Sequence, residues 1–222
     1  MSQPVERLGE EMRLYHCLDA RSFRALWALE ELEWTYELEM LPFPPRVHRK
    51  TYLEHNPLGT VPLLVDGDSR LTESSAICHY LSTIRPSSLA VLPGEPDYAG
   101  FLNALYQSDA TLTFPQTLVL RYGQLEPEDR RSPQIVDDYS RWFHARMRSV
   151  DARLADHEFI AAERFTVADI AIGYALKLAG IIGLDRDFSP RLTNYWSRLA
   201  SRPAYARADE AQQVAYRESM GA

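Results

Sequence analysis

Two kinds of hydrophobic spacing divide the chain and predict two domains. Up to residue 86, short runs alternate between apolar and polar positions, which is typical of half-buried strands. From residue 97 onward, apolar residues recur every three or four positions over long stretches, which predicts amphipathic helices. The spacing therefore predicts an α/β domain at 12–86 and an all-α domain at 97–222.

The first half predicts the element order β-α-β, a loop, and then β-β-α. The run "YELEML" places Tyr36, Leu38 and Met40 on one face of a strand, with glutamates on the other face. Asp66 and Gly67 begin the tight turn of a hairpin. The predicted strands are 12–17, 36–41, 61–65 and 70–72, and the predicted helices begin near Asp19 or Ser22 and at Ser74.

One helix of the second half is expected at the centre of a helical bundle. In "FTVADIAIGYALKLAGI" (165–181), Ile170 and Tyr174 lie on one face, and Ile172 and Leu176 lie on the opposite face. A helix that is apolar all round is usually buried on every side.

Composition and charge restrict the class of protein. Of 222 residues, 45% are apolar and 25% are charged, which is usual for a globular protein. The formal net charge is 24 − 31 = −7, which argues against broad binding of nucleic acid or of an anionic membrane. The first residues do not have the pattern of a signal peptide, and no apolar run reaches the roughly 18 residues that indicate a transmembrane helix. A cytoplasmic protein is therefore expected.

The cysteines and histidines predict neither a disulfide framework nor a metal site. Cys17 and Cys78 are far apart in sequence, and no CxxC motif or Cys/His cluster occurs. We therefore expect chemistry that needs no metal.

The Val61–Pro62 pair suggests a site for an extended ligand. An X-Pro bond favours extended backbone before the proline and adopts the cis form at modest cost. Such a junction would turn the N–H and C=O of Val61 away from the sheet, where they would pair with a peptide-like ligand. The alternative is that Pro62 only begins an edge strand.

The residues that follow suggest a partner for a charged head group. The start of a helix presents unpaired N–H groups, and the hydroxyl of Ser74 would add a donor for a carboxylate. Glu73 beside it would hold an ammonium group. Together they would bind the head of an α-amino acid, although Thr72, Ser74 or Ser75 would also serve as a plain helix cap.

These motifs, taken together, resemble the glutathione S-transferase family. The similarity covers residues 12–210, and the turn "HCLDARSFR" is similar to the bacterial and fungal branch. Thr166 and Asp169 match the capping box of the family's central helix, in which each side chain accepts from the other residue's backbone N–H. The matching segments are "NPLGTVPLL" (56–64), "TESSAI" (72–77), "RFTVADIAI" (164–172) and "SRPAYARA" (201–208).

The resemblance implies a fold and a glutathione site. It implies a thioredoxin-like glutathione-binding domain at 12–86, and an all-helical domain at 97–222 that forms the pocket for the electrophile. Val61, before a cis Pro62, would pair with the cysteinyl part of glutathione, and Glu73 and Ser74 would hold the γ-glutamyl head. His48 or Arg49 would meet the glycine carboxylate, although that loop aligns loosely and its cations would also suit a solvated surface.

The group that activates the thiol is left open by the sequence. In the serine-using branches of the family, a hydroxyl lies at the start of the first helix, and the matching position here is Ala20. Four substitutes remain, and Ser22 is the first choice. The others, in order, are the backbone N–H groups with the charge of Arg21, then Tyr15 on the first strand, and last Cys17. Each of these side chains would also suit a core or capping role.

The resemblance implies an enzyme that activates the glutathione thiol for attack on a small hydrophobic electrophile. Its partners would be glutathione and the electrophile, with no metal, nucleic acid or membrane, and the family is usually homodimeric. One alternative is a non-catalytic binding or regulatory protein of the same fold, which Ala20 favours. A glutathione-dependent isomerase is a further alternative, but "LDARS" lacks most of the serines and the cysteine of that first turn.

Overall fold

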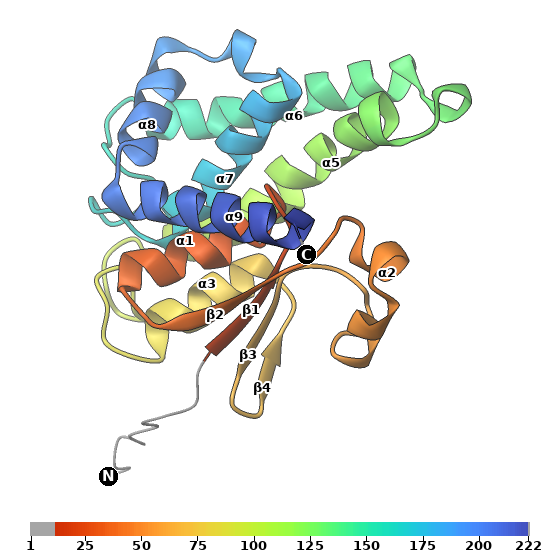
Figure 1. Cartoon of the computed structure of the whole chain (residues 1–222). Helices are drawn as coiled ribbons and strands as arrows, with labels where there is room; N and C mark the ends of the chain where they lie inside the picture. The colour runs from red at the N-terminus through yellow and green to blue at the C-terminus, as the bar shows by residue number, and fades with distance from the viewer. Residues whose placement is uncertain (1–11, 222) are drawn as a thin grey trace. The chain divides into compact units, whose positions relative to one another are not determined.

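A four-stranded mixed sheet with the order β2-β1-β3-β4 forms the centre of the first part of the chain (Figure 1). The computed structural model describes residues 12–221. The strands are β1 (Met12–His16), β2 (Tyr36–Met40), β3 (Leu63–Asp66) and β4 (Ser69–Leu71).

The register of the sheet places β1 between two other strands. β1 pairs with β2 in parallel and with β3 antiparallel, so Leu14 lies opposite both Leu38 and Leu64. A parallel pair needs a crossover connection, and α1 (Phe23–Leu32) supplies it. Although "MRLYHC" alternates, Tyr15 and His16 are both buried. The strand predicted at 12–17 is therefore confirmed as β1, and its second half is buried on both faces of the sheet.

The segment between β2 and β3 is mostly irregular. It contains the short helix α2 (Pro45–His48) and the 3₁₀ turn η1 (Lys50–Glu54). Two peptide bonds there are cis, Phe43–Pro44 and Val61–Pro62, and the second confirms the geometry expected for Pro62. The next helix, α3 (Ser74–Thr83), follows β4 after two residues.

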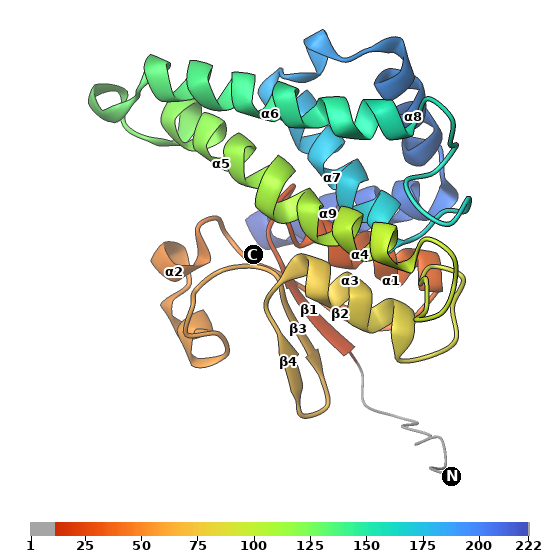
Figure 2. The same cartoon turned by 180° about the vertical axis from the view of Figure 1, so that it is seen from behind.

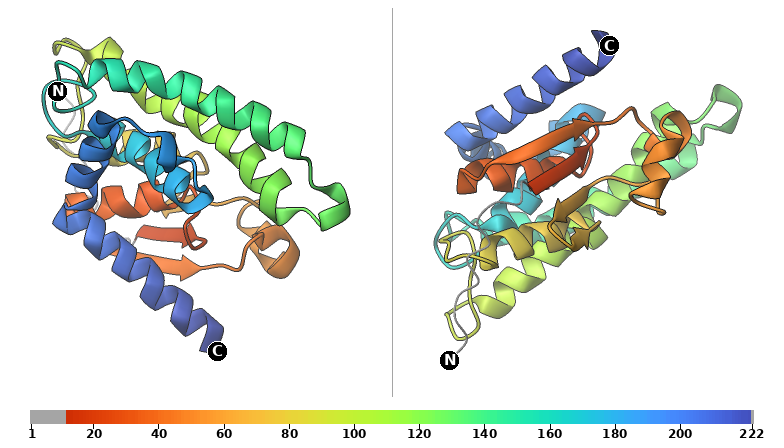
Figure 3. Two further views of the ribbon diagram at one scale, coloured as in Figure 1. Left: turned by 90° about the horizontal axis from the view of Figure 1, so that it is seen from above. Right: turned by 60° about the horizontal axis from the view of Figure 1, so that its bottom comes forward.

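The second part of the chain is helical, as predicted. Its helix α7 is buried over most of its length, which confirms its expected central place. Helices α5 and α6 run side by side (Figure 2 and the left view of Figure 3). The helices are α4 (Tyr98–Gln107), α5 (Phe114–Leu120), α6 (Pro133–Arg153), α7 (Val167–Ile182) and α8 (Pro190–Ala200). Shorter helical segments are η2 (Ser108–Thr113), η3 (Arg121–Leu125), η4 (Glu128–Arg130) and η5 (Asp185–Asp187).

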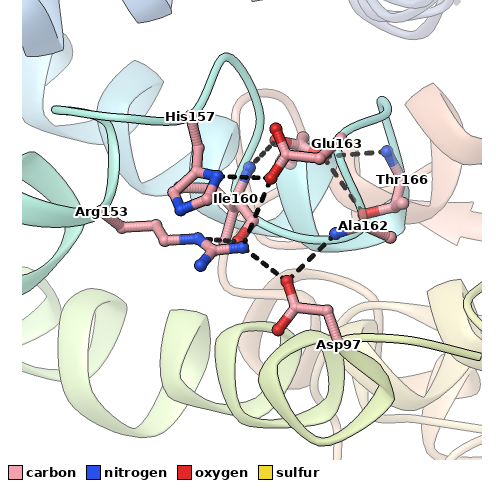
Figure 4. Close-up of polar contacts among 8 residues, drawn as sticks. Asp97, Arg153, His157, Ile160, Ala162, Glu163 and Thr166 are labelled. Atoms are coloured by element: carbon pink, nitrogen blue, oxygen red, sulfur yellow. Dashed lines mark hydrogen bonds and ion pairs between the residues drawn. The ribbon is translucent and has the colours of Figure 1, made fainter.

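The capping box at the start of α7 is present. The backbone N–H of Thr166 donates to Oδ2 of Asp169 at 2.8 Å, and the Thr166 side chain caps the helix in return. The loop before it is held by ion pairs, which Figure 4 shows: Arg153 contacts Asp97 at 2.5 Å, and His157 contacts Glu163.

The last helix, α9 (Pro203–Gly221), is divided between the two compact units of the chain. One unit joins the chain up to Ile77 to the segment from Arg207 onward, and the other is Cys78–Ala206. The domain ranges 12–86 and 97–222 stay a prediction, and the compact units differ from them at the first boundary and in the place of α9. None of the helices described between residues 12 and 221 is long and apolar enough to cross a membrane.

Candidate functional site

A buried cluster in the first unit brings two of the predicted site segments together. The cluster consists of side chains from β1, the loops and β3: Tyr15, Cys17, Leu41, Tyr52 and Leu63. Ala20, in the loop between β1 and α1, packs against it, and so does Val61. The loop that would activate a thiol and the proline junction that would bind a peptide therefore pack against the same buried cluster.

The backbone before Pro62 is held by two side chains. The Tyr52 hydroxyl donates to the carbonyl of Thr60 at 2.7 Å, and Nδ2 of Asn56 donates to the same oxygen at 2.8 Å. Pro62 is buried and Val61 is half-buried. The ladder of β3 begins at Leu63, so Val61 lies just outside it. This is the position from which a backbone can pair with an extended ligand.

The start of α3 has the geometry of a helix cap with a buried serine. The carbonyl of Glu73 accepts from the N–H of Ile77 at 2.8 Å, so Glu73 itself stands at the N-cap position, with its side chain exposed. Ser74 is only 3% exposed, and its Oγ accepts from Nη1 of Arg24 at 2.9 Å. Ser75 is also buried, and its Oγ has no hydrogen-bond partner within the described part of the chain.

Arg24 was missed as a site residue by sequence reasoning. It is completely buried in α1 and reaches across to the first residue of α3. The signal for it is weak in the sequence, because a single arginine in an apolar helical stripe is compatible with a solvated face.

The loop between β1 and α1 is compact, and Ser22 lies inside it. The N–H of Ala20 donates to the carbonyl of Cys17 at 3.1 Å, and Phe23 N–H donates to the carbonyl of Ala20 at 2.9 Å. Ser22 is completely buried, and its Oγ accepts from the Cys17 N–H at 3.4 Å. Its side chain does not cap α1. The structure therefore places the Ser22 hydroxyl beneath the loop surface.

Tyr15 and Cys17 are both buried, in contacts that are independent of any ligand. The Tyr15 ring lies 5.3 Å from that of Tyr52 and 5.4 Å from that of His55, centre to centre. Interactions with Tyr15 and Glu37 raise the pKa of Arg13. Burial raises the pKa of the Cys17 thiol to about 12, which keeps it protonated at neutral pH.

The cations expected at the glycine end of the ligand lie on the surface. His48 ends α2 and is exposed, and Arg49 follows it. Nη1 of Arg49 lies 3.5 Å from Oε1 of Glu39, so this guanidinium already has an acidic neighbour. Among residues 12–221, no group of three or more His, Cys, Asp or Glu side chains is arranged to hold a metal ion.

Comparison with known proteins gives a consistent set of relatives. The family model described as "Glutathione S-transferase, N-terminal domain" matches residues 20–84. The chain is 30% identical to glutathione S-transferase 4 of Zea mays, over 82% of this chain and 83% of the relative. It is 28% identical to the glutathione S-transferase GstB of Escherichia coli strain K12, over 82% of this chain and 88% of the relative.

A solved structure agrees with these relatives. The structure of a sphingomonad glutathione S-transferase complexed with glutathione has a TM-score of 0.80 and 26% identity to this chain. The match covers 90% of this chain and 98% of that one.

Proposed function

Because the chain belongs to the glutathione S-transferase family, we propose that it ionises the thiol of glutathione and directs it to a hydrophobic electrophile. The protein is a glutathione transferase of thioredoxin-like and all-helical fold, with glutathione as its cosubstrate. One observation carries the site: Ala20 and Val61 pack on the same buried cluster. A ligand paired with the Val61 backbone would then have its sulfur near the loop that contains Ala20.

The residues at the proline junction and at the start of α3 bind two different parts of glutathione. The backbone of Val61, before Pro62, pairs with the cysteinyl part. Glu73 binds the ammonium of the γ-glutamyl head, and Ser74 with the N-terminus of α3 binds its carboxylate. Arg24 keeps the Ser74 hydroxyl oriented by donating to its oxygen.

The glycine carboxylate would be met by His48 or Arg49. Both lie on the exposed segment at the end of α2. The contact of Arg49 with Glu39 favours His48 as the first partner of the ligand, because Arg49 would have to share its charge.

Because Ser22 is buried, a different group is favoured as the activator of the thiol. This group is the backbone N–H groups together with the charge of Arg21, the second alternative from the sequence. The backbone N–H groups at the start of α1 and the charge of Arg21 would stabilise the thiolate, since positive charge near a sulfur lowers its pKa. The thiolate then forms the new carbon–sulfur bond. With an aryl halide, the halide leaves with the electron pair of the broken bond. Ser22, Tyr15 and Cys17 would shape the loop from below.

Arg21→Ala is expected to lower kcat by about tenfold at neutral pH, because a neighbouring positive charge shifts a thiol pKa by about one unit or more. Ser22→Ala should keep kcat within about threefold and lower the free energy of unfolding by about 1–2 kcal/mol, because the buried Cys17 N–H loses its acceptor. Steady-state kinetics and urea unfolding of both variants check this. A fall of tenfold or more in Ser22→Ala alone would instead make Ser22 the thiol donor.

The proposed function is tested by retention on immobilised glutathione together with turnover of chlorodinitrobenzene. Glu73→Ala should raise the KM for glutathione by about tenfold or more, because it removes a charge-assisted contact with the ammonium group. Glu54→Ala is the matched control, since Glu54 is also an exposed glutamate of the first unit. Equal KM values in the two variants would place the γ-glutamyl head elsewhere.

A second candidate is a non-catalytic member of the family, and Ala20 is the observation that favours it. Retention on glutathione without turnover of any aryl halide would support this alternative. We further propose a homodimer that works in detoxification in the cytoplasm, with small hydrophobic electrophiles as second substrates and neither nucleic acid nor membrane as a partner. Light scattering of the purified protein measures its oligomeric state.

A further inference from the structure

The side-chain amide of Gln212 joins the last helix to the loop between β1 and α1. Gln212 lies on α9 and is completely buried, 193 residues along the chain from the loop that it contacts. Its Oε1 accepts from the backbone N–H of Asp19 at 3.1 Å and lies 3.1 Å from Nε2 of His16. Its Nε2 donates to Oδ1 of Asp19 at 3.0 Å and to Oδ1 of Asp209 at 2.9 Å. The amide thereby uses all of its hydrogen-bonding capacity.

Chemistry permits only one orientation of this amide. The backbone N–H of Asp19 can only donate, so it must face Oε1 of Gln212. The carboxylates of Asp19 and Asp209 can only accept, so they must face Nε2. Because Oε1 has no proton to give, His16 must carry its own proton on Nε2. Gln212 therefore fixes the loop at two atoms of Asp19, one in the backbone and one in the side chain.

The loop needs such a support, because Asp19 adopts an uncommon backbone conformation. Its φ is 54°, in the left-handed region that a non-glycine residue seldom occupies. The next residue is Ala20, which packs on the cluster that also supports Val61. A change in the backbone at Asp19 would therefore move Ala20 and the segment just before α1, where Arg21 lies.

A second contact joins α9 to the opposite end of α1 and offers a natural control. Arg207 donates from Nε to Oε2 of Glu30 at 2.9 Å and from Nη2 to the Glu30 carbonyl at 2.7 Å. Glu30 lies in the last turn of α1, and Figure 1 shows α9 alongside that helix. Helix α9 is thus attached near both ends of α1, but the Gln212 contacts are the ones made with the loop.

We propose that Gln212 is a positioning residue for thiol activation. By holding Asp19, it keeps the start of α1 and the charge of Arg21 in position near the sulfur of bound glutathione. The inference rests on the proposed function above. It means that α9, through Gln212, helps to position the loop that activates the thiol. When the amide is removed, glutathione should still bind, but its thiol should ionise less readily.

The test is a pH titration of the bound thiol, followed by the ultraviolet absorbance of the thiolate in the intact protein with saturating glutathione. In Gln212→Ala the pKa of the bound thiol should rise by about one pH unit, and kcat at neutral pH should fall about tenfold, whereas the KM for glutathione should change less than about threefold. Arg207→Ala removes the other attachment of α9 and should leave the thiol pKa unchanged.

A second variant keeps the inference testable if the alanine variant does not fold. Gln212→Glu keeps oxygens that accept from Asp19 N–H and His16, but sets a third carboxylate against those of Asp19 and Asp209. Its bound thiol should also be harder to ionise than that of the wild type, and kcat relative to wild type should fall further as this carboxylate loses its proton with rising pH.

The outcomes separate this inference from the proposed function. Suppose that the wild type turns over the aryl halide, and that the pKa of the bound thiol is the same in the Gln212 variants as in Arg207→Ala. The positioning role of Gln212 is then wrong, and the proposed function stands. If the wild type neither binds glutathione nor turns over the aryl halide, the proposed function fails and this inference fails with it.

Discussion

Asp169→Ala is expected to lower the free energy of unfolding by about 3–5 kcal/mol, because it leaves several buried donors without an acceptor. Asp169 is completely buried at the start of α7. Its carboxylate accepts from the N–H of Ile160 at 3.0 Å and from the Tyr195 hydroxyl at 2.7 Å. It also accepts from the N–H of Thr166 at 2.8 Å and from the Thr166 hydroxyl at 3.1 Å. Urea unfolding followed by circular dichroism measures the loss.

Tyr195→Phe is the control for this prediction. It removes a single donor from the Asp169 carboxylate and should cost about 1 kcal/mol. Burial raises the pKa of Asp169, and the four hydrogen bonds oppose that rise, so the carboxylate depends on its full set of partners. If Asp169→Ala is no more destabilising than Tyr195→Phe, the capping network does not stabilise the second unit as argued.

Arg24→Ala is expected to affect both stability and glutathione binding. The free energy of unfolding should fall by about 2–5 kcal/mol, because a long buried side chain and its hydrogen bond are lost together. The KM for glutathione should rise about tenfold, because the Ser74 hydroxyl loses the donor that orients it, and tenfold corresponds to about 1.4 kcal/mol. Steady-state kinetics with varied glutathione and urea unfolding measure the two effects.

Arg24→Met separates the two consequences of losing Arg24. Methionine fills most of the volume but donates no hydrogen bond, so stability should recover in part while the KM stays high. Arg24→Lys keeps a charge without the planar guanidinium and should lie between methionine and the wild type in KM. An unchanged KM in Arg24→Met would show that Ser74 needs no help from Arg24.

Local sequence patterns predicted the parts of the fold that depend on neighbouring residues. The strand and helix order was expected from the residue spacing, and the capping box of Thr166 and Asp169 and the cis bond at Pro62 were expected from the family resemblance. The structure has all three. Each depends on residues a few positions apart, because turn, cap and periodicity rules act over short distances. The roles given to Val61, Glu73 and Ser74 stay predictions, but the structure does place Val61 and Ala20 on one cluster.

Contacts between distant residues could not be predicted in the same way. The sequence gives no reason to join Arg24 to Ser74, 50 residues away, or Gln212 to Asp19. Ser22 illustrates the limit within a short loop. Its hydroxyl is close in sequence to the expected donor position, but the turn of the backbone buries it. Side-chain direction depends on the folded backbone, which periodicity does not specify at a loop.

The place of α9 has a consequence for how the protein is made. The sheet is translated before the other unit, yet its own unit also contains the segment from Arg207 onward, which is translated after the other unit. Domains often fold in the order of their synthesis on the ribosome. Here the unit that begins the chain cannot be finished until the final helix has left the exit tunnel, whereas every residue of the other unit has emerged before that point. A nascent chain stalled just short of Arg207 should therefore carry all four strands but lack the last segment of their unit.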